Sequence, residues 1–198
     1  MKLMKLRYLP LLLLACLPVL AFAETTTWSV DPRHSSAAFS VRHLGISNVK
    51  GNFSKVSGQV VLDDKDITHS SVDVSIDAIS VDTGVAGRDE DLKGPKYFDV
   101  AQYPTIKFKS KSVEKNGDRL KVSGDLTIHG VTRPATLDVE GPSEPISDPR
   151  GDSHRGISAS TKLNRHDFGV DGGKMVVGDM VQISIDVEIV LPAIKPAK

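Results

Sequence analysis

The heptapeptide NRHDFGV, residues 164–170, carries the side chains in this sequence most suggestive of catalysis. In a protein kinase, Asp-Phe-Gly holds Mg²⁺ beside ATP and His-Arg-Asp marks the catalytic loop; here the two motifs nearly merge. Kinase chemistry also needs a glycine-rich phosphate loop, a strand lysine and the two motifs in separate places. The sequence does not meet these requirements, which argues against phosphoryl transfer of the kinase type.

The histidines and serines give no better catalytic pattern. No two histidines form His-x-His or His-Glu-x-x-His, and the only cysteine is Cys16, so the sequence predicts no metal site. Ser35 and Ser36 lack the Gly-x-Ser-x-Gly elbow of a serine hydrolase. We therefore predict that the protein is not an enzyme and requires no cofactor. The histidines after residue 23 are expected at turns and on the surface: His34, His43, His69, His129, His154 and His166.

Residues 1–23 have the features of a secretory signal peptide. Three basic residues precede a short apolar run that contains two prolines and ends in Ala-Phe-Ala. The run is too short to span a bilayer comfortably. We predict cleavage before Glu24, which releases a mature periplasmic protein of residues 24–198. The Leu-Leu-Ala-Cys sequence that ends at Cys16 is an alternative site for lipoprotein anchoring.

The composition narrows the class of partner. The chain has 25 Lys and Arg against 25 Asp and Glu, so no basic excess is available to bind nucleic acid. A chain of this length can bury a sizeable core without disulfides. With no internal repeat and no long linker, the sequence predicts one domain.

Apolar and polar residues alternate through most of the chain after residue 23. Period-two alternation is typical of strands with one solvent-exposed face and one buried face. Short turns between the runs favour an antiparallel sheet. The sequence therefore predicts an all-β fold of at least eight strands, arranged as a sandwich or a closed barrel. The runs span residues 36–42, 56–62, 72–77, 106–109, 120–128, 137–139, 157–163 and 181–189.

Two segments interrupt the alternation. Residues 84–100 are charged and then aromatic, and predict a loop with a short helix over about 88–92. Residues 141–154 are rich in Pro, Gly and Ser and predict an exposed loop. The dry face itself is built from Val, Ile, Leu, Ala and Gly with few aromatics, and such small side chains favour a barrel that encloses a cavity.

Four ordered blocks of the sequence resemble the YceI-like family of periplasmic polyisoprenoid-binding proteins. They are WSVDPRHSSAAFSVRHLGISNVKGNF, GRDEDLKGPKYFDVAQYPTIKFKS, VSGDLTIHGVTRPATL and LNRHDFGV with VVGDMVQISIDVEI, between Trp28 and Val190. The resemblance implies an eight-stranded antiparallel lipocalin-like barrel with one or two short helices in its loops. It also implies an apolar tunnel for a long isoprenoid chain and no established enzymatic activity.

The resemblance also accounts for the Asp-Phe-Gly tripeptide, which falls in the family's Asn-Arg-x-Asp-Phe-Gly block at a strand end. There Gly169 is expected to permit a tight turn, Phe168 to enter the core and Asp167 to pair with Arg165. The chain departs from the family at Asp91, where a histidine is common. This exchange alters the charge beside the expected tunnel mouth, so the preferred head group is the least transferable property.

The predicted ligand is a long-chain isoprenoid lipid, either a polyprenyl species or an isoprenoid quinone, carried or stored in the periplasm. Transient contact with the inner membrane or a membrane protein is expected, and a homodimer is left open. The alternatives are an enzyme acting on a lipid or quinone, suggested by the polar blocks near Arg88 and Asn164, and a stress-related interaction protein with a filled barrel. Expected at the tunnel mouth are His43 and Arg88; expected in the lining are Phe39, Val41, Phe53, Ile76, Phe98, Phe108, Leu126, Ile128, Phe168 and Ile183.

Overall fold

The computed structural model describes residues 25–193, so the predicted signal peptide and the alternative site at Cys16 lie outside the described residues. Within this range, none of the helices has the length and apolarity needed to cross a bilayer. Strands make up most of the chain: β1 (Thr25–Val30), β2 (Ser36–His43), β3 (Ser47–Phe53), β4 (Val56–Asp63), β5 (Ser71–Asp77), β6 (Val81–Asp82), β7 (Thr105–Asn116), β8 (Arg119–Ile128), β9 (Val131–Glu140), β10 (Ile146–Ser147), β11 (Ser153–Asn164) and β12 (Val177–Leu191).

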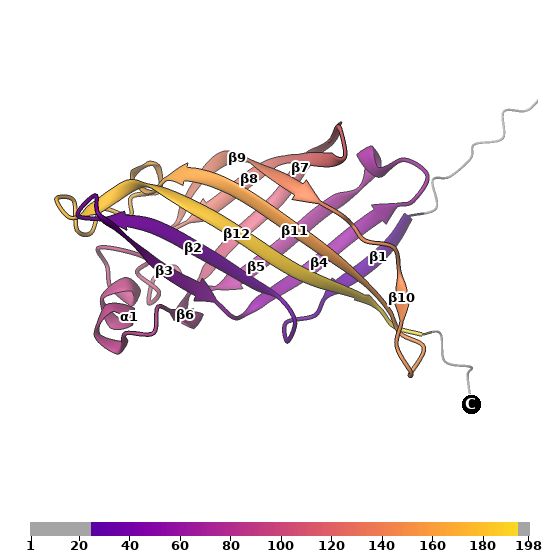
Figure 1. The fold of residues 1–198 in the computed structure, drawn as a ribbon, viewed down its shortest axis with the longest axis horizontal. Coiled ribbons are helices and arrows are strands. Elements are labelled where there is room, and N and C mark those ends of the chain that lie inside the picture. Colours follow the sequence, from indigo (N-terminus) through magenta and orange to yellow (C-terminus); the bar gives the residue numbers. More distant parts are fainter. Residues whose placement is uncertain (1–24, 194–198) are drawn as a thin grey trace, which may run out of the picture.

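Eight of these strands close into a ring (Figure 1). Their order is β11-β9-β8-β7-β5-β4-β1-β12, and β12 pairs back with β11. Every pairing in the sheet is antiparallel. The structure therefore confirms the predicted eight-stranded antiparallel barrel. Closure leaves few free strand edges, which is how such barrels avoid edge-to-edge association.

The last strand, β12, joins three neighbours. Its C-terminal part pairs with β1 through Val30↔Ile189, and its middle part pairs with β2 through Ile183↔Phe39. Strands β1 and β2 thus occupy successive halves of one edge of β12. From β2 the sheet continues outward to β3 and β6, while β10 adds to β11.

Short helices occupy the loops, as the sequence predicted. The α-helix α1 (Ala86–Lys93) extends the helix expected over 88–92, and it lies beside β6 at the left end of the barrel in Figure 1. Asp89 in its first turn accepts a hydrogen bond from the Thr83 N–H at 2.8 Å, which ties the helix to the preceding loop. The remaining helices are the 3₁₀ turns η1 (Ile67–His69), η2 (Ala78–Ser80) and η3 (Arg165–Phe168).

The alternation in the sequence sets the two faces of the barrel wall. Along β4, for example, Val56, Val60 and Leu62 are almost fully buried, whereas Ser57 and Gln59 between them are more exposed. The same alternation runs through β5, β7, β8 and β12, so the inner wall is apolar along the whole ring. The core is tightest where β1, β4 and β12 meet, around Trp28, Val56 and Ile189.

Glycine is required at position 58, where β4 pairs with β5 through Gly58↔Val74. Its φ is +138°, and a Cβ there would lie 2.3 Å from the Asp73 carbonyl oxygen. We expect Gly58→Ala to lower the free energy of unfolding by at least about 2 kcal/mol, because it combines backbone strain with overpacking. Urea unfolding measures this loss.

The matched control is Gly87→Ala in α1, where an added Cβ would meet no atom within 4 Å. Since alanine favours a helix more than glycine does, this variant should gain up to about 1 kcal/mol. Equal effects at the two positions would contradict the geometry described for Gly58.

Candidate functional site

The barrel encloses a cavity of about 240 Å³, so its own side chains do not fill it. Its walls are apolar apart from four residues, Ser70, Lys107, Thr161 and Arg165. All ten residues predicted for the tunnel lie in this lining: Phe39, Val41, Phe53, Ile76, Phe98, Phe108, Leu126, Ile128, Phe168 and Ile183. That they contact a ligand stays a prediction.

Many aliphatic side chains complete the lining. Most of them lie at inward-facing positions of the strands, so the alternation in the sequence could have identified them. The prediction instead favoured aromatic and larger side chains. The additional residues include Val56, Val60, Leu62, Val72, Val74, Ile106, Val113, Leu120, Val122, Leu137, Val139, Ile157, Leu163, Val181, Ile185 and Val187.

The cavity is long and narrow. Its lining on β12 begins at Val177 and ends at Val187, ten residues apart. At about 3.3 Å per strand residue this is a distance of roughly 30 Å, close to the thickness of the hydrocarbon core of a bilayer. A volume of about 240 Å³ lined over such a length makes the cavity a narrow tunnel.

Aromatic rings gather at the α1 end of the tunnel. The Phe53 ring lies 5.8 Å from that of Phe39 and 5.3 Å, edge to face, from that of Phe98. Gly51 has no side chain where the Phe39 ring lies, since a Cβ there would come within 2.4 Å of that ring. The glycine therefore leaves room for the Phe39 ring against β3.

Arg165 is a buried cation beside this end of the tunnel, with 5% of its surface exposed. Its guanidinium donates to four carbonyl oxygens, of Val170 at 2.7 Å, Gly172 at 2.7 Å, Gly178 at 3.0 Å and Val177 at 3.1 Å. These bonds satisfy the buried charge and fix the loop between η3 and β12. We name residues 170–178 the Arg165-bound loop.

The predicted pairing of Asp167 with Arg165 is wrong. The guanidinium turns inward to backbone carbonyls, and the Asp167 carbonyl oxygen instead accepts from Arg133 at 3.1 Å. The other two expectations for this tripeptide are confirmed. Phe168 is buried at 3% exposure, and Gly169 ends η3 in the left-handed conformation with a φ of 74°.

Neither predicted mouth residue lines the cavity. His43 ends β2 opposite Val177 and Ser47, so it lies at the same end of the barrel as the aromatic rings. The Arg88 side chain donates to Thr83, at 2.8 Å to Oγ1 and 3.0 Å to the carbonyl oxygen. A role for either residue at the mouth stays a prediction.

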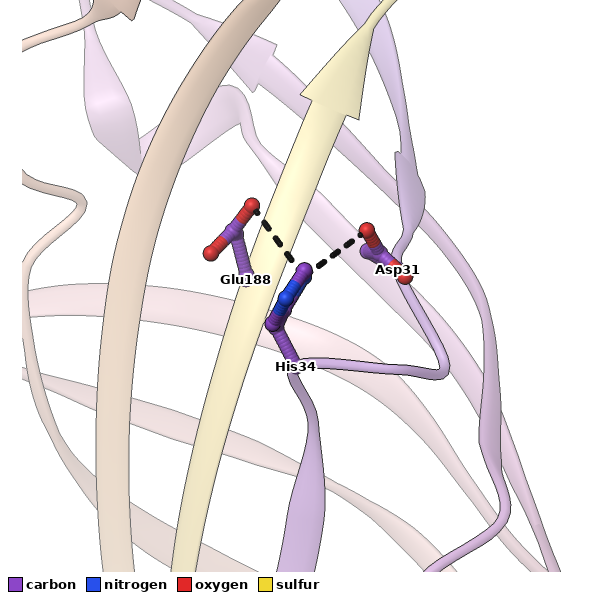
Figure 2. A group of neighbouring side chains, drawn as sticks. All are labelled: Asp31, His34 and Glu188. Carbon is purple, nitrogen blue, oxygen red and sulfur yellow. Dashed lines mark hydrogen bonds and ion pairs between the residues drawn. The ribbon is translucent and has the colours of Figure 1, made fainter.

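A polar cluster, which the sequence did not predict, lies at the turn between β1 and β2. Figure 2 shows His34 between two carboxylates, with Nδ1 at 3.1 Å from Asp31 Oδ2 and 3.8 Å from Glu188 Oε1. Glu188 also faces His154 Nδ1 at 2.7 Å. One nitrogen and two oxygen ligand atoms lie within 4.8 Å of one another, a spacing a cation can occupy. In this structure Arg33 supplies the compensating positive charge at Asp31.

Asp31 gives the cluster a pH dependence. A hydrogen bond from the Arg33 side chain lowers the pKa of this buried carboxyl to about 2, below the unfolded value of about 3.9. Because the folded pKa is depressed, the stabilisation is present above pH 4 and is lost as the pH falls toward 2. Arg33 is 72% exposed, so solvent screening limits the contribution to about 1 to 2 kcal/mol.

The substitution Asp31→Asn tests this assignment. We expect the variant to be less stable than the wild type at pH 7 by that amount, and the difference to shrink between pH 4 and pH 2. Urea unfolding at several pH values measures it. A difference that stays constant with pH would rule out titration of Asp31 as its cause.

Comparisons with known proteins agree with this architecture. Residues 28–189 match the model of the YceI-like domain. A UPF0312 protein of Vibrio parahaemolyticus is 35% identical over 170 residues, which cover 84% of this chain and 87% of that protein. Protein YceI of Escherichia coli O157:H7 is 35% identical over 160 residues, covering 80% and 82%.

Solved structures share the barrel. BcnA of Burkholderia cenocepacia is 25% identical with a TM-score of 0.70, covering 80% of this chain and 98% of that one. The YCEI protein of Campylobacter jejuni is 32% identical with a TM-score of 0.67, covering 77% and 90%. A polyisoprenoid binding domain from Saccharophagus degradans, 17% identical, has the same fold with a TM-score of 0.64 over 83% and 98%. By sequence and by fold, the chain belongs to the YceI-like family.

Proposed function

We propose that this protein binds a long-chain isoprenoid lipid in the periplasm and carries or stores it there. The observation that carries the proposal is the narrow apolar cavity of about 240 Å³ along the inside of the barrel. The ligand is a polyprenyl species or an isoprenoid quinone, and no cofactor is needed to hold it. The resemblance to a family of polyisoprenoid-binding proteins supports this choice, and a neighbour in fold is described as a polyisoprenoid binding domain.

The hydrophobic effect supplies the affinity. Each buried CH₂ group contributes about 0.8 kcal/mol, so a chain that fills much of the tunnel has ample driving force to leave water. The shape of the tunnel favours one chain over two, which argues for a prenyl lipid rather than a diacyl phospholipid. An apolar wall discriminates poorly between chains that differ by a methylene.

The head group must then remain near an end of the barrel, because the walls offer it few polar partners. Lys107 is itself exposed, and the Arg165 guanidinium already donates to four carbonyls. A pyrophosphate or a quinone ring buried mid-tunnel would lose its hydration without compensation. The chain therefore enters the barrel and the polar head stays at its mouth.

Native mass spectrometry of the mature protein purified from periplasm tests this function, followed by solvent extraction of any bound molecule. We expect a stoichiometric adduct that releases a prenyl lipid. A clean apo mass, unchanged after incubation with quinones and polyprenols, would overturn the proposal. Recovery of the protein from the periplasmic fraction tests the localisation in the same preparation.

The residues that suggested an enzyme have structural partners. Arg88 donates to Thr83, and the Asn164 side chain accepts from the His166 N–H at 3.0 Å to cap η3. Turnover of a bound quinone or polyprenyl ester that disappears in Arg88→Ala would favour an enzyme over a carrier. We expect no turnover across such a panel.

A further inference from the structure

Exposed apolar side chains gather at one end of the barrel. Eight large apolar side chains are exposed among residues 25–193, and five of them come from the β2–β3 turn and from residues 175–180 around the start of β12. We name these five the apolar tip: Leu44 (57% exposed), Ile46 (81%), Met175 (95%), Val176 (39%) and Met180 (43%). They lie at the left end of the barrel in Figure 1, where the β2–β3 turn meets the loop before β12.

Backbone hydrogen bonds hold the two segments together. The Leu44 N–H donates to the Val176 carbonyl oxygen at 2.7 Å, and Val177 pairs with His43 in the sheet. The Arg165-bound loop carries Met175, so a buried cation fixes the backbone from which this side chain projects. The backbone therefore holds these apolar side chains exposed to solvent. This exposure costs free energy that an isolated monomer in water does not regain.

The tip is continuous with the tunnel. Val177 lines the cavity and directly follows Val176 of the tip. Tyr97, another lining residue, packs its ring on Gly172, where a Cβ would come within 2.3 Å of it. A lipid chain that leaves the tunnel at this end would therefore emerge beside the exposed apolar side chains.

Exposed cations lie in the segments beside the tip, and the acidic residues of α1 (Asp89, Glu90 and Asp91) lie at the same end of the barrel. Arg42, Lys50 and Lys96 are exposed, and in the described part of the chain none of them has a carboxylate within 4.0 Å. The two acidic residues of the same loop region are engaged. Asp171 faces Lys174 at 3.6 Å and His166, and Asp179 faces His166 Nε2 at 3.0 Å.

We propose that the apolar tip docks onto an anionic lipid bilayer, with its apolar side chains among the acyl chains and the neighbouring cations at the head groups. This inference rests on the proposed function, because a ligand this apolar must be collected from, or delivered to, a membrane. Exposed apolar side chains with cations beside them are a combination that binds anionic membrane surfaces. A two-fold dimer through the same tip would instead bring identical cations face to face.

Flotation of the mature protein with vesicles of phosphatidylethanolamine and phosphatidylglycerol tests the docking. We expect binding to these vesicles, weaker binding to phosphatidylcholine vesicles, and a decrease with added salt. The substitution Ile46→Glu should lower the vesicle-bound fraction at least tenfold. The matched control is Ile146→Glu, which changes another highly exposed isoleucine (70%), on β10 at the opposite end of the barrel in Figure 1, and should leave binding unchanged.

Three results would overturn the docking: a wild type that does not float, equal losses in both variants, or a dimer in solution that Ile46→Glu dissociates. The last would make a second copy the occupant of the tip. Ligand uptake from detergent micelles, followed by native mass spectrometry, separates this inference from the proposed function. If the protein takes up the ligand normally but does not bind vesicles, the docking alone is refuted. If it binds vesicles but takes up no ligand, the proposed lipid carrier is refuted.

Discussion

Replacement of Leu126 by arginine is expected to weaken lipid binding at least about a hundredfold. Leu126 lies on β8 opposite Phe108, lines the cavity and packs against the two core clusters on either side of it. An arginine at this position would bring an unpaired charge into an apolar tunnel, which costs several kcal/mol. Titration of the purified variant with a fluorescent polyprenol analogue measures the change.

Two companion variants separate occlusion from misfolding. Ser123→Arg introduces the same charge on the outer face of the same strand, where Ser123 contacts Thr136 at 2.9 Å, and should bind the probe normally. Leu126→Trp fills the tunnel without charge and should also block binding. If folded Leu126→Arg and Leu126→Trp proteins bound the probe like the wild type, Leu126 would not belong to the binding site.

The substitution Arg165→Met should cost about 3 to 5 kcal/mol of folding free energy. It removes four hydrogen bonds from a buried cation and leaves the carbonyls of the Arg165-bound loop without donors, each at roughly 1 to 3 kcal/mol before the loop relaxes. Methionine keeps much of the apolar stem of arginine. The loss of stability therefore reflects the missing guanidinium rather than a change in side-chain volume. Chemical unfolding monitored by circular dichroism measures it.

The matched control for this prediction is Arg133→Met. Arg133 is exposed and makes one hydrogen bond, to the Asp167 carbonyl oxygen, in the neighbouring turn η3. Its loss should change stability by about 0.5 kcal/mol or less. Similar effects of the two substitutions would show that the Arg165-bound loop does not depend on its buried cation.

The barrel and its inner wall could be predicted because one physical signal determines both. In a strand the side chains alternate between the two faces. Val181 and Ile183 flank Gln182 in the sequence, so both had to point away from the Gln182 face and into the apolar interior. Strands without clear alternation did not appear among the alternating runs. β3, with the sequence SNVKGNF, has little apolar pattern of its own and forms because it pairs with β2 along its full length.

The polar parts of the molecule could not be predicted in the same way. Arg165 sits in a charged stretch that is typical of a surface turn, and only the fold reveals the carbonyls that turn inward toward it. The cluster of Asp31, His34 and Glu188 joins residues more than 150 positions apart in the sequence, which become neighbours through the register of β12. Spacing along the chain carries no information about such a register.

The place of β12 in the ring has a consequence for how the chain assembles. This strand contains the last described residues of the sheet, and it completes the ring through its pairings with β1 and β11. Until residues 177–191 have been synthesised, the nascent chain is an open sheet. The edges of β1 and β11 that later pair with β12 then have no strand partner. Contacts between the first and last strands give the barrel a high contact order, and such topologies fold in milliseconds to seconds rather than microseconds. Closure therefore requires residues 177–191, and without them the sheet stays open between β1 and β11.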